Sequence, residues 1–272
     1  MSSRTPGTVI EELDDSIVVL RLSRPGRLNA TGEDIQAALR DALERWAVDD
    51  RCRAVVLTGD GEGAFSSGAD VGDENTHATP VDRYLEKLAV GEHPTFDRVL
   101  RFPKPLIAAV SGYAIGWGCL ICLGCDLIVA DRTADFRLTQ ATFGVLPAFG
   151  GVARLAQWVG RGRAMDIAVR RRPVRAEEAY EIGLAAELCE EGELLEVAKA
   201  VAHQCAEVPP LTFKLIKDSM YQAMEGAIRS ASTADLYRLG LLEQDETTRQ
   251  AHQAWRDRKA ARDAVETRKE AE

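Results

Sequence analysis

Three short and continuously apolar runs lie in the first half of the chain: AVVLTG at 54–59, PLIAAVSG at 105–112 and CDLIVAD at 125–131. Each run is bounded by turn-forming residues and is short enough to be a strand. A strand without polar alternation is typical of a sheet that is covered on both faces. Helical patterns alternate with these runs, so the sequence predicts a layered α/β domain.

The N-terminal segment fits the same architecture. Residues 8–22 predict two short strands around a turn, and apolar side chains recur at helical spacing over 32–47, which indicates an amphipathic helix with one buried face. Thr31 and Asp34 form a T-x-x-D pattern, which predicts that a capping box begins this helix.

The remaining segments divide into a long loop and a helical half. The polar loop at 60–80 is long for a compact domain, and loops of that kind are usually functional or mobile. We expect a helix at 81–101, and a mostly helical chain from about Gly151 onwards. Since the end of the chain is charged and nearly free of apolar residues, a disordered tail is expected at 259–272.

The composition excludes several classes of function. The formal net charge of −9 argues against nucleic-acid binding, because phosphate contacts need a basic face. No apolar run reaches the roughly 18 residues that span a bilayer, and the N-terminus lacks the apolar segment of a signal peptide. The chain has 6 cysteines in 272 residues, too few for a disulfide scaffold. We therefore expect a reduced, cytoplasmic protein without a membrane partner.

A possible nucleotide motif has a simpler explanation. Gly59, Gly61 and Ala64 fit the dinucleotide pattern G-x-G-x-x-A. However, no helix-forming run follows Ala64, and the acidic Asp60 and Glu62 would face the pyrophosphate. A glycine turn is the better interpretation.

The cysteines and histidines also favour structural roles. Cys119, Cys122 and Cys125 have metal-like spacing, but a structural zinc site needs four ligands and no His or second C-x-x-C pair is close in sequence. On a helix these three positions share one face, where cysteine packs as a small hydrophobic residue. The sequence has no G-x-S-x-G motif, so a hydrolytic triad on an α/β-hydrolase elbow is unsupported.

Two glycine-containing segments each follow an expected strand: FSSGAD at 65–70 and GYAIGWG at 112–118. Their small residues allow a ligand to approach the backbone, and the second segment also opens a helix, whose first N–H groups carry partial positive charge. Two such amides that converge on one point would form an oxyanion hole, which stabilises negative charge on a carbonyl oxygen. An apolar helix can therefore take part in catalysis through its backbone.

Taken together, four ordered segments resemble the crotonase superfamily, also called the enoyl-CoA hydratase/isomerase family: RPGRLNA, FSSGADV, SGYAIGWGCLICLGCDLIVADRTADF and FGVLPAFGGVARLAQWVG. The similarity extends from about residue 8 to about residue 258. It implies an α/β spiral of ββα units over 1–200 and a helical trimerisation region over 201–258. It also implies an acyl-CoA substrate, no cofactor beyond the coenzyme A of that substrate, and a homotrimer or dimer of trimers.

The resemblance assigns roles to particular positions. The two oxyanion amides of the family fall on Ser67 and Trp117. The family usually has glycine at the second position, so the indole of Trp117 is expected to narrow or reshape the pocket. The CoA contacts of the family, made partly by backbone atoms, fall on six residues: Arg27, Leu28, Ala30, Ala69, Asp70 and Val71.

This chain departs from the hydratases of the family at their two catalytic glutamates. Those residues activate water as general acid and base, whereas here the positions are Leu120 and Gln140. Leucine transfers no proton, and glutamine has no useful pKa but can hydrogen-bond a water or a carbonyl. The acid of some dienoyl isomerases falls on Ala148. Standard hydration of an enoyl thioester is therefore not expected.

Other groups would have to move the proton. The region 70–98 resembles the variable pocket wall of the family, and it offers six candidates that are otherwise solvated loop residues: Asp73, Glu74, His77, Tyr84, Glu86 and His93. With one of them, decarboxylation, C–C cleavage, isomerisation or thioester hydrolysis would need only enolate stabilisation. Two alternatives stay open: a catalytically silent acyl-CoA-binding homologue, and a relative that acts on a diketone without CoA.

Overall fold

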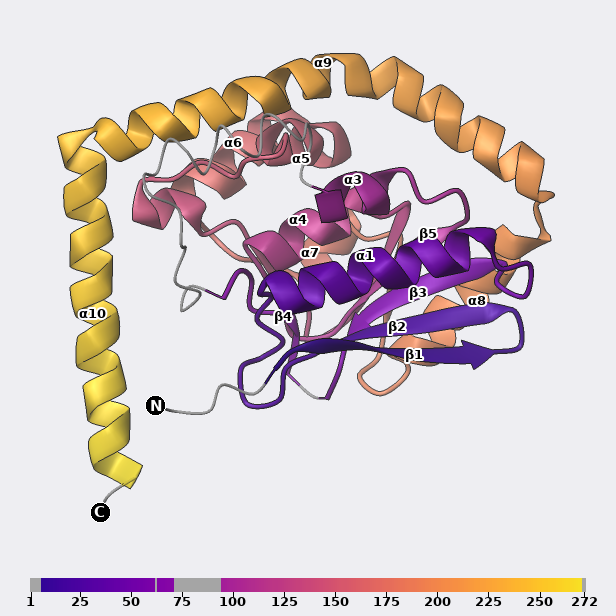
Figure 1. Ribbon diagram of the computed structural model, residues 1–272, viewed down its shortest axis with the longest axis horizontal. Helices are drawn as coiled ribbons and strands as arrows, with labels where there is room; N and C mark the ends of the chain where they lie inside the picture. Colours follow the sequence, from indigo (N-terminus) through magenta and orange to yellow (C-terminus); the bar gives the residue numbers. More distant parts are fainter. Residues whose placement is uncertain (1–5, 62, 71–93, 271–272) are drawn as a thin grey trace.

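The computed structural model describes residues 6–61, 63–70 and 94–270. These residues form two sheets, with helices around them (Figure 1). The strands are β1 (Thr8–Asp14), β2 (Ile17–Ser23), β3 (Ala54–Gly59), β4 (Ala64–Ser66), β5 (Leu106–Val110), β6 (Tyr113–Ile115), β7 (Leu127–Asp131), β8 (Asp135–Arg137), β9 (Val174–Arg175) and β10 (Glu187–Cys189). The helices are α1 (Glu33–Val48), α3 (Pro94–Leu100), α4 (Trp117–Gly124), the 3₁₀ turn η1 (Gln140–Phe143), α5 (Gly151–Val159), α6 (Arg161–Arg170), α7 (Ala176–Glu181), α8 (Leu194–Glu207), α9 (Pro210–Gln244) and α10 (Glu246–Glu270).

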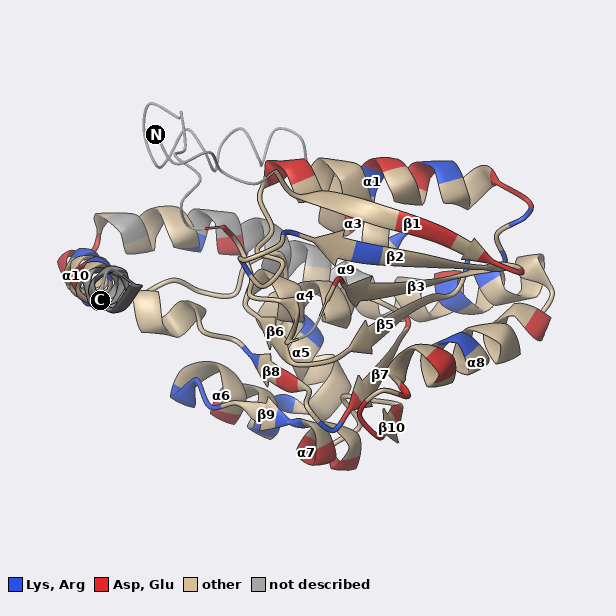
Figure 2. Ribbon diagram, turned by 90° about the horizontal axis from the view of Figure 1, so that it is seen from below, with Lys and Arg blue, Asp and Glu red and all other residues tan. Residues whose placement is uncertain are grey.

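The first sheet has the order β1-β2-β3-β5-β7-β10, and all its pairs are parallel except the hairpin β1–β2. Its side chains alternate between two cores: Val18 and Leu57 belong to the core that includes α1, whereas Val19 and Val56 belong to the core that includes α8. Figure 2 shows α1 and α8 on opposite sides of this sheet. The predicted sheet with two covered faces is confirmed.

The second sheet has the order β4-β6-β8-β9. Along the chain, β3, β5 and β7 lie in the first sheet, and the strand that follows each of them, β4, β6 or β8, lies in the second. This repetition is the predicted spiral of ββα units. Because β4 and β6 are parallel neighbours, their carboxyl ends lie side by side, and these ends carry the two glycine-containing segments.

The predicted capping box at the start of α1 is wrong. The residue that caps α1 is Gly32, and no side chain caps the helix. The Thr31 hydroxyl instead donates to the Gly68 carbonyl oxygen at 3.1 Å, and the Asp34 carboxylate accepts hydrogen bonds from the Gly7 amide and from Arg24. Both side chains are therefore used in contacts between segments that are distant in sequence.

Two helix boundaries also differ from expectation. Of the helix expected at 81–101, only α3 from Pro94 onwards falls in the described part of the chain. At the C-terminus, α10 continues to Glu270, so the segment 259–270 is helical where a disordered tail was predicted. This helix has a charged sequence with little apolar character, which is why its pattern did not predict a packed element.

The two C-terminal helices enclose one end of the domain. In Figure 1, α9 arches over α5 and α6, and α10 then turns down along the side of the molecule. The rings of Phe143 on η1 and Trp255 on α10 meet edge to face, 4.8 Å apart between centroids. Among the described helices, none is both long and apolar enough to cross a bilayer.

Candidate active site

The glycine-containing segments meet where β4 and β6 end. Ser66 and Ala114 are partners in this pair of strands, and the chain then passes through Gly68 and Gly116, whose φ angles are +96° and +55°. A Cβ atom on Gly68 would lie 2.7 Å from the Ile115 carbonyl oxygen and 3.5 Å from the Trp117 nitrogen. Only glycine allows this close approach, which places the first segment directly against the start of α4.

The structure does not support the oxyanion role predicted for Ser67. The Ser67 amide donates to the Leu28 carbonyl oxygen at 2.8 Å, and the Ser67 hydroxyl donates to the Arg27 carbonyl oxygen at 3.2 Å. Both groups are thus directed at the 24–30 loop. An amide that is already used in this way is not available to a substrate carbonyl.

The Ala69 amide, two residues after Ser67, is directed away from the 24–30 loop. Ala69 forms a parallel bridge with Thr31. The Thr31 amide donates to the Gly68 carbonyl oxygen at 2.8 Å, and the Asp70 amide donates to the Thr31 carbonyl oxygen at 3.0 Å. In this pattern the N–H of Ala69 points away from Thr31, towards the side on which β6 runs. Ala69 is exposed, and within the part of the chain that the structure describes its amide has no acceptor.

Trp117, whose amide is the second predicted donor, is the first residue of α4. The helix is capped by Gly116, whose carbonyl oxygen accepts a hydrogen bond from the Leu120 amide at 3.0 Å. The first N–H groups of a helix, which include that of Trp117, are not used by the i to i−4 hydrogen bonds of the helix. The helix dipole adds positive potential at this end. The indole is 7% exposed and packs in the main core, which makes Trp117 a structural side chain as well as a source of an amide.

The two positions at which the hydratases carry glutamate are occupied very differently. Leu120 is buried, and a Cβ atom on Gly151 would lie only 2.3 Å from its Cδ2, so leucine packs closely against the start of α5. Gln140 begins η1, and its buried Oε1 has no hydrogen-bond partner in the described residues. Ala148, at the position expected for the acid of some dienoyl isomerases, is buried against Leu239 of α9. None of these side chains can transfer a proton.

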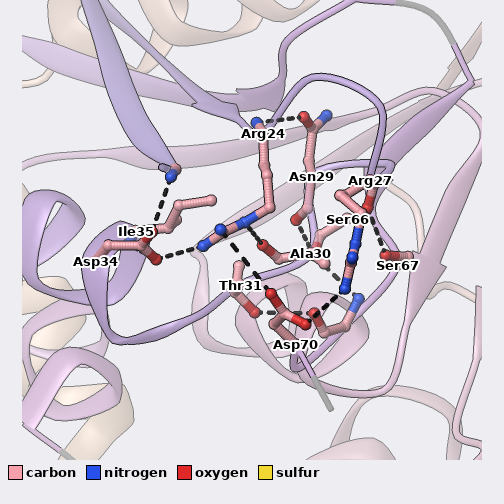
Figure 3. Close-up of polar contacts among 12 residues, drawn as sticks. Arg24, Arg27, Asn29, Ala30, Thr31, Asp34, Ile35, Ser66, Ser67 and Asp70 are labelled. Carbon is pink, nitrogen blue, oxygen red and sulfur yellow. Dashed lines mark hydrogen bonds and ion pairs between the residues drawn. The ribbon is translucent and has the colours of Figure 1, made fainter. Parts of the chain in front are cut away.

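Figure 3 shows a polar cluster that ties together the two loops of the predicted CoA site. Arg24 is 2% exposed; it donates to the Ala30 carbonyl oxygen at 2.8 Å, pairs with Asp34 and lies 3.9 Å from Asp70. Arg27 is half exposed and pairs with the buried Asp70 at 3.0 Å. Burial alone would raise the pKa of Asp34, but hydrogen bonds from two backbone amides and the charge of Arg24 lower that pKa below its usual value.

The cluster places the predicted CoA contacts side by side, as their sequence positions implied. Arg27 and Leu28 are about half exposed, Ala30 is buried, and Ala69 and Asp70 face them across the parallel bridge. Sequence reasoning missed Arg24, although an arginine directly after an apolar strand was a signal for a buried ion pair. Seven candidates lie outside the described residues: Val71, Asp73, Glu74, His77, Tyr84, Glu86 and His93.

Comparison with known proteins identifies the family and the fold of this chain. A family model described as enoyl-CoA hydratase/isomerase matches residues 12–263. The short-chain-enoyl-CoA hydratase of Clostridium acetobutylicum is 33% identical over 223 residues, which cover 82% of this chain and 84% of that protein. The 1,2-epoxyphenylacetyl-CoA isomerase of Escherichia coli is 32% identical over 216 residues, covering 79% and 82%. A crystal structure of carnitinyl-CoA hydratase from Mycobacterium avium superposes with a TM-score of 0.80 at 27% identity, covering 92% of this chain and 96% of that chain.

Proposed function

The chain belongs to the enoyl-CoA hydratase/isomerase family, and from this premise we propose that it is an enzyme that polarises the thioester carbonyl of an acyl-CoA between two backbone amides. These amides are those of Ala69 and Trp117. The observation that carries the proposal is the Ala69 N–H, which has no acceptor among the described residues and is directed to the side where α4 begins.

The chemistry of such a pair follows from where charge develops. When a proton, a carboxyl group or a carbon fragment leaves the α-carbon of a thioester, negative charge moves to the carbonyl oxygen. Two fixed N–H donors stabilise that enolate, and each donor of this kind contributes roughly 10²–10³ in rate. The dipole of α4 acts in the same direction because its positive end lies at Trp117.

The side chains around the amides argue against hydration by two carboxylates. Leu120 is packed against Gly151 and Gln140 is an amide, so neither position supplies a general acid or base. We therefore propose a reaction that needs a stabilised oxyanion, either an enolate or, for hydrolysis, the tetrahedral adduct of water with the thioester, together with a single proton donor or a water. Decarboxylation, C–C cleavage, isomerisation and thioester hydrolysis all meet this requirement.

The coenzyme A part of the substrate would lie along the 24–30 and 66–70 loops. Arg27 is half exposed at this edge and can reach a phosphate, while the exposed Leu28 and Ala69 offer backbone atoms to the pantetheine and adenine groups. No separate cofactor is proposed. By the same family argument, we propose a homotrimer or a dimer of trimers located in the cytoplasm.

A second candidate function is a silent acyl-CoA-binding protein, which the packed Leu120 favours. Steady-state turnover of malonyl-, β-ketoacyl- and enoyl-CoA esters, combined with calorimetric titration of CoA, separates the candidates. Turnover of any ester supports the enzyme. Tight CoA binding without turnover of any ester supports the silent binder, and turnover of a free diketone without CoA binding would point to the alternative substrate class.

A further inference from the structure

The second sheet carries polar side chains on the face that is turned away from the main core. Ala114 in β6, Phe136 in β8 and Val174 in β9 belong to that core. Side chains alternate between the two faces along a strand, so the residues beside these three point the other way. We call four of them the arginine cluster: Tyr113, Asp135, Arg137 and Arg175.

Both arginines of the cluster contact one carboxylate. Arg137 donates to Asp135 through Nε, at 2.9 Å from Oδ1, and through Nη2, which bonds to Oδ2. Arg175 comes from β9, which lies beside β8 in Figure 2, and its Nη1 is 2.9 Å from the same Oδ2. Since each guanidinium has a nitrogen within hydrogen-bond distance of one oxygen atom, the two positive charges lie next to each other.

The cluster holds more positive charge than its aspartate balances. Among the described residues, Asp135 is the only carboxylate that forms an ion pair with Arg137 or Arg175. Arginine does not lose its proton in proteins, so one of the two positive charges is not compensated within the cluster. The repulsion between neighbouring cations favours the binding of an anion from outside.

The cluster is accessible, and part of its hydrogen-bonding capacity is unused. Asp135 is 1% exposed, whereas Arg137 is 31% and Arg175 61% exposed. Nη1 of Arg137, and Nε and Nη2 of Arg175, have no acceptor among the described residues. The Arg137 guanidinium also lies over the ring of the partly exposed Tyr113, 5.3 Å from its centroid, so this side chain has little freedom left to lose on binding.

We propose that the arginine cluster is a binding site for a phosphate group, either inorganic phosphate or the phosphate of a small phosphomonoester. A phosphate group carries a charge of about −1.5 to −2 at pH 7 and several acceptor oxygens, so it can bridge two guanidiniums. A carboxylate has one charge and two oxygens and is expected to bind more weakly. This site goes beyond the proposed function, because it uses neither the two amides nor the loops assigned to coenzyme A.

The test is a calorimetric titration at low ionic strength with inorganic phosphate, glycerol 3-phosphate and acetate. We expect the unaltered protein to bind at least one of the two phosphate compounds with a Kd on the order of 1 mM, and acetate about tenfold more weakly. Arg175→Gln removes the more exposed cation while Asp135 keeps Arg137, and it should weaken phosphate binding about tenfold or more. Arg175→Lys keeps the charge without the planar fork, so it should weaken binding less than Arg175→Gln does.

The two phosphate compounds separate the possible sources of the ligand. Tighter binding of glycerol 3-phosphate than of inorganic phosphate would support a phosphomonoester site, and the reverse order would support a site for the free ion. Acetate that binds as tightly as either phosphate compound would refute the assignment to phosphate.

The matched control is Arg163→Gln, since Arg163 is an exposed arginine on α6 that forms no ion pair with the described residues. It should leave phosphate binding unchanged, and each variant is compared after circular dichroism shows that it is folded. Equal weakening by Arg163→Gln and Arg175→Gln would refute the site in favour of a general effect of charge. Full binding in Arg175→Gln, or a loss in Arg27→Gln alone, would also refute it, as would the absence of binding by both phosphate compounds. None of these outcomes depends on turnover of an acyl-CoA, so the proposed function stands or falls separately.

Discussion

Replacing Trp117 by proline removes one proposed oxyanion donor without breaking a helical hydrogen bond. Trp117 is the first residue of α4, and proline is well tolerated at the first position of a helix because its fixed φ suits that turn. The preceding Gly116 has φ +55° and ψ −111°, outside the helical region that a following proline disfavours. The backbone is therefore expected to accept Trp117→Pro.

The matched control is Trp117→Ala, which keeps the amide but loses the same indole. The indole is 7% exposed, so both variants should lose about 3–5 kcal/mol of folding stability. The variants differ mainly in the N–H. If that group stabilises the enolate, Trp117→Pro should have a kcat about 10²–10³ lower than Trp117→Ala, which is roughly 2.7–4 kcal/mol of transition-state stabilisation.

The assay is steady-state turnover of the acyl-CoA ester that the unaltered protein processes, at a temperature at which circular dichroism shows both variants folded. Because the donor acts on charge that develops in the transition state, the loss should appear in kcat more than in KM. A Trp117→Pro variant that turns over within about threefold of Trp117→Ala would contradict the proposed role of this amide.

Three further predictions test other parts of the structure. Hydration of crotonyl-CoA, measured as the loss of enoyl absorbance, should be at least about 10³-fold slower than in a relative with both glutamates. An ordinary rate of about 1–10³ s⁻¹ would contradict the expectation that Leu120 and Gln140 do not support hydration. Lys217→Met leaves the largely buried Asp126 without the ammonium group 2.8 Å away and should lower the free energy of unfolding by about 3–5 kcal/mol. Burial already raises the pKa of Asp126, and loss of Lys217 should raise that pKa further, so the folded variant binds this proton more tightly. The stability that the variant loses relative to the unaltered protein should therefore shrink as pH falls from about 8 to about 5 in denaturant titrations. A stability loss that does not change with pH would contradict this linkage. Trp255→Ala removes the edge-to-face contact with Phe143 and should speed amide hydrogen exchange in η1 and in α10. Unchanged exchange in η1 would show that packing against α10 does not stabilise η1.

The sequence predicts the first sheet well because its strands have a local signal. Runs such as AVVLTG have consecutive apolar residues without polar alternation, and they become β3, β5 and β7 with small shifts at their ends. The second sheet had no such signal. Its strands β4, β6 and β8 have three residues each, too few for a periodic pattern, and they are defined by their pairing with one another.

The error at Ser67 has a physical cause that the sequence alone does not reveal. In a regular strand, alternate amides point to the same side, so Ser67 and Ala69 would be equivalent. The φ of +96° at Gly68 breaks that alternation, and Ser67 and Asp70, three residues apart, both donate towards the 28–31 segment. The Ala69 amide is left on the opposite side. The family resemblance points to a loop, whereas the choice of an amide within that loop depends on the backbone geometry.

The same geometry explains how a chain with Leu120 and Gln140 at the positions expected for the two glutamates could keep the proposed site for a carbonyl. The proposed donors belong to the backbone, and their placement depends on the close approach at Gly68, on the cap at Gly116 and on the buried Arg24 beside Asp70. The Leu120 side chain takes part in none of these features, since Leu120 contributes only its amide, which donates to the Gly116 carbonyl oxygen at 3.0 Å. A different side chain at position 120 is therefore expected to leave the proposed oxyanion geometry in place and to change which proton moves and which acyl groups fit. For this reason the reaction is better identified from the side chains that line the site than from the two amides, which the chain would share with relatives of different activity.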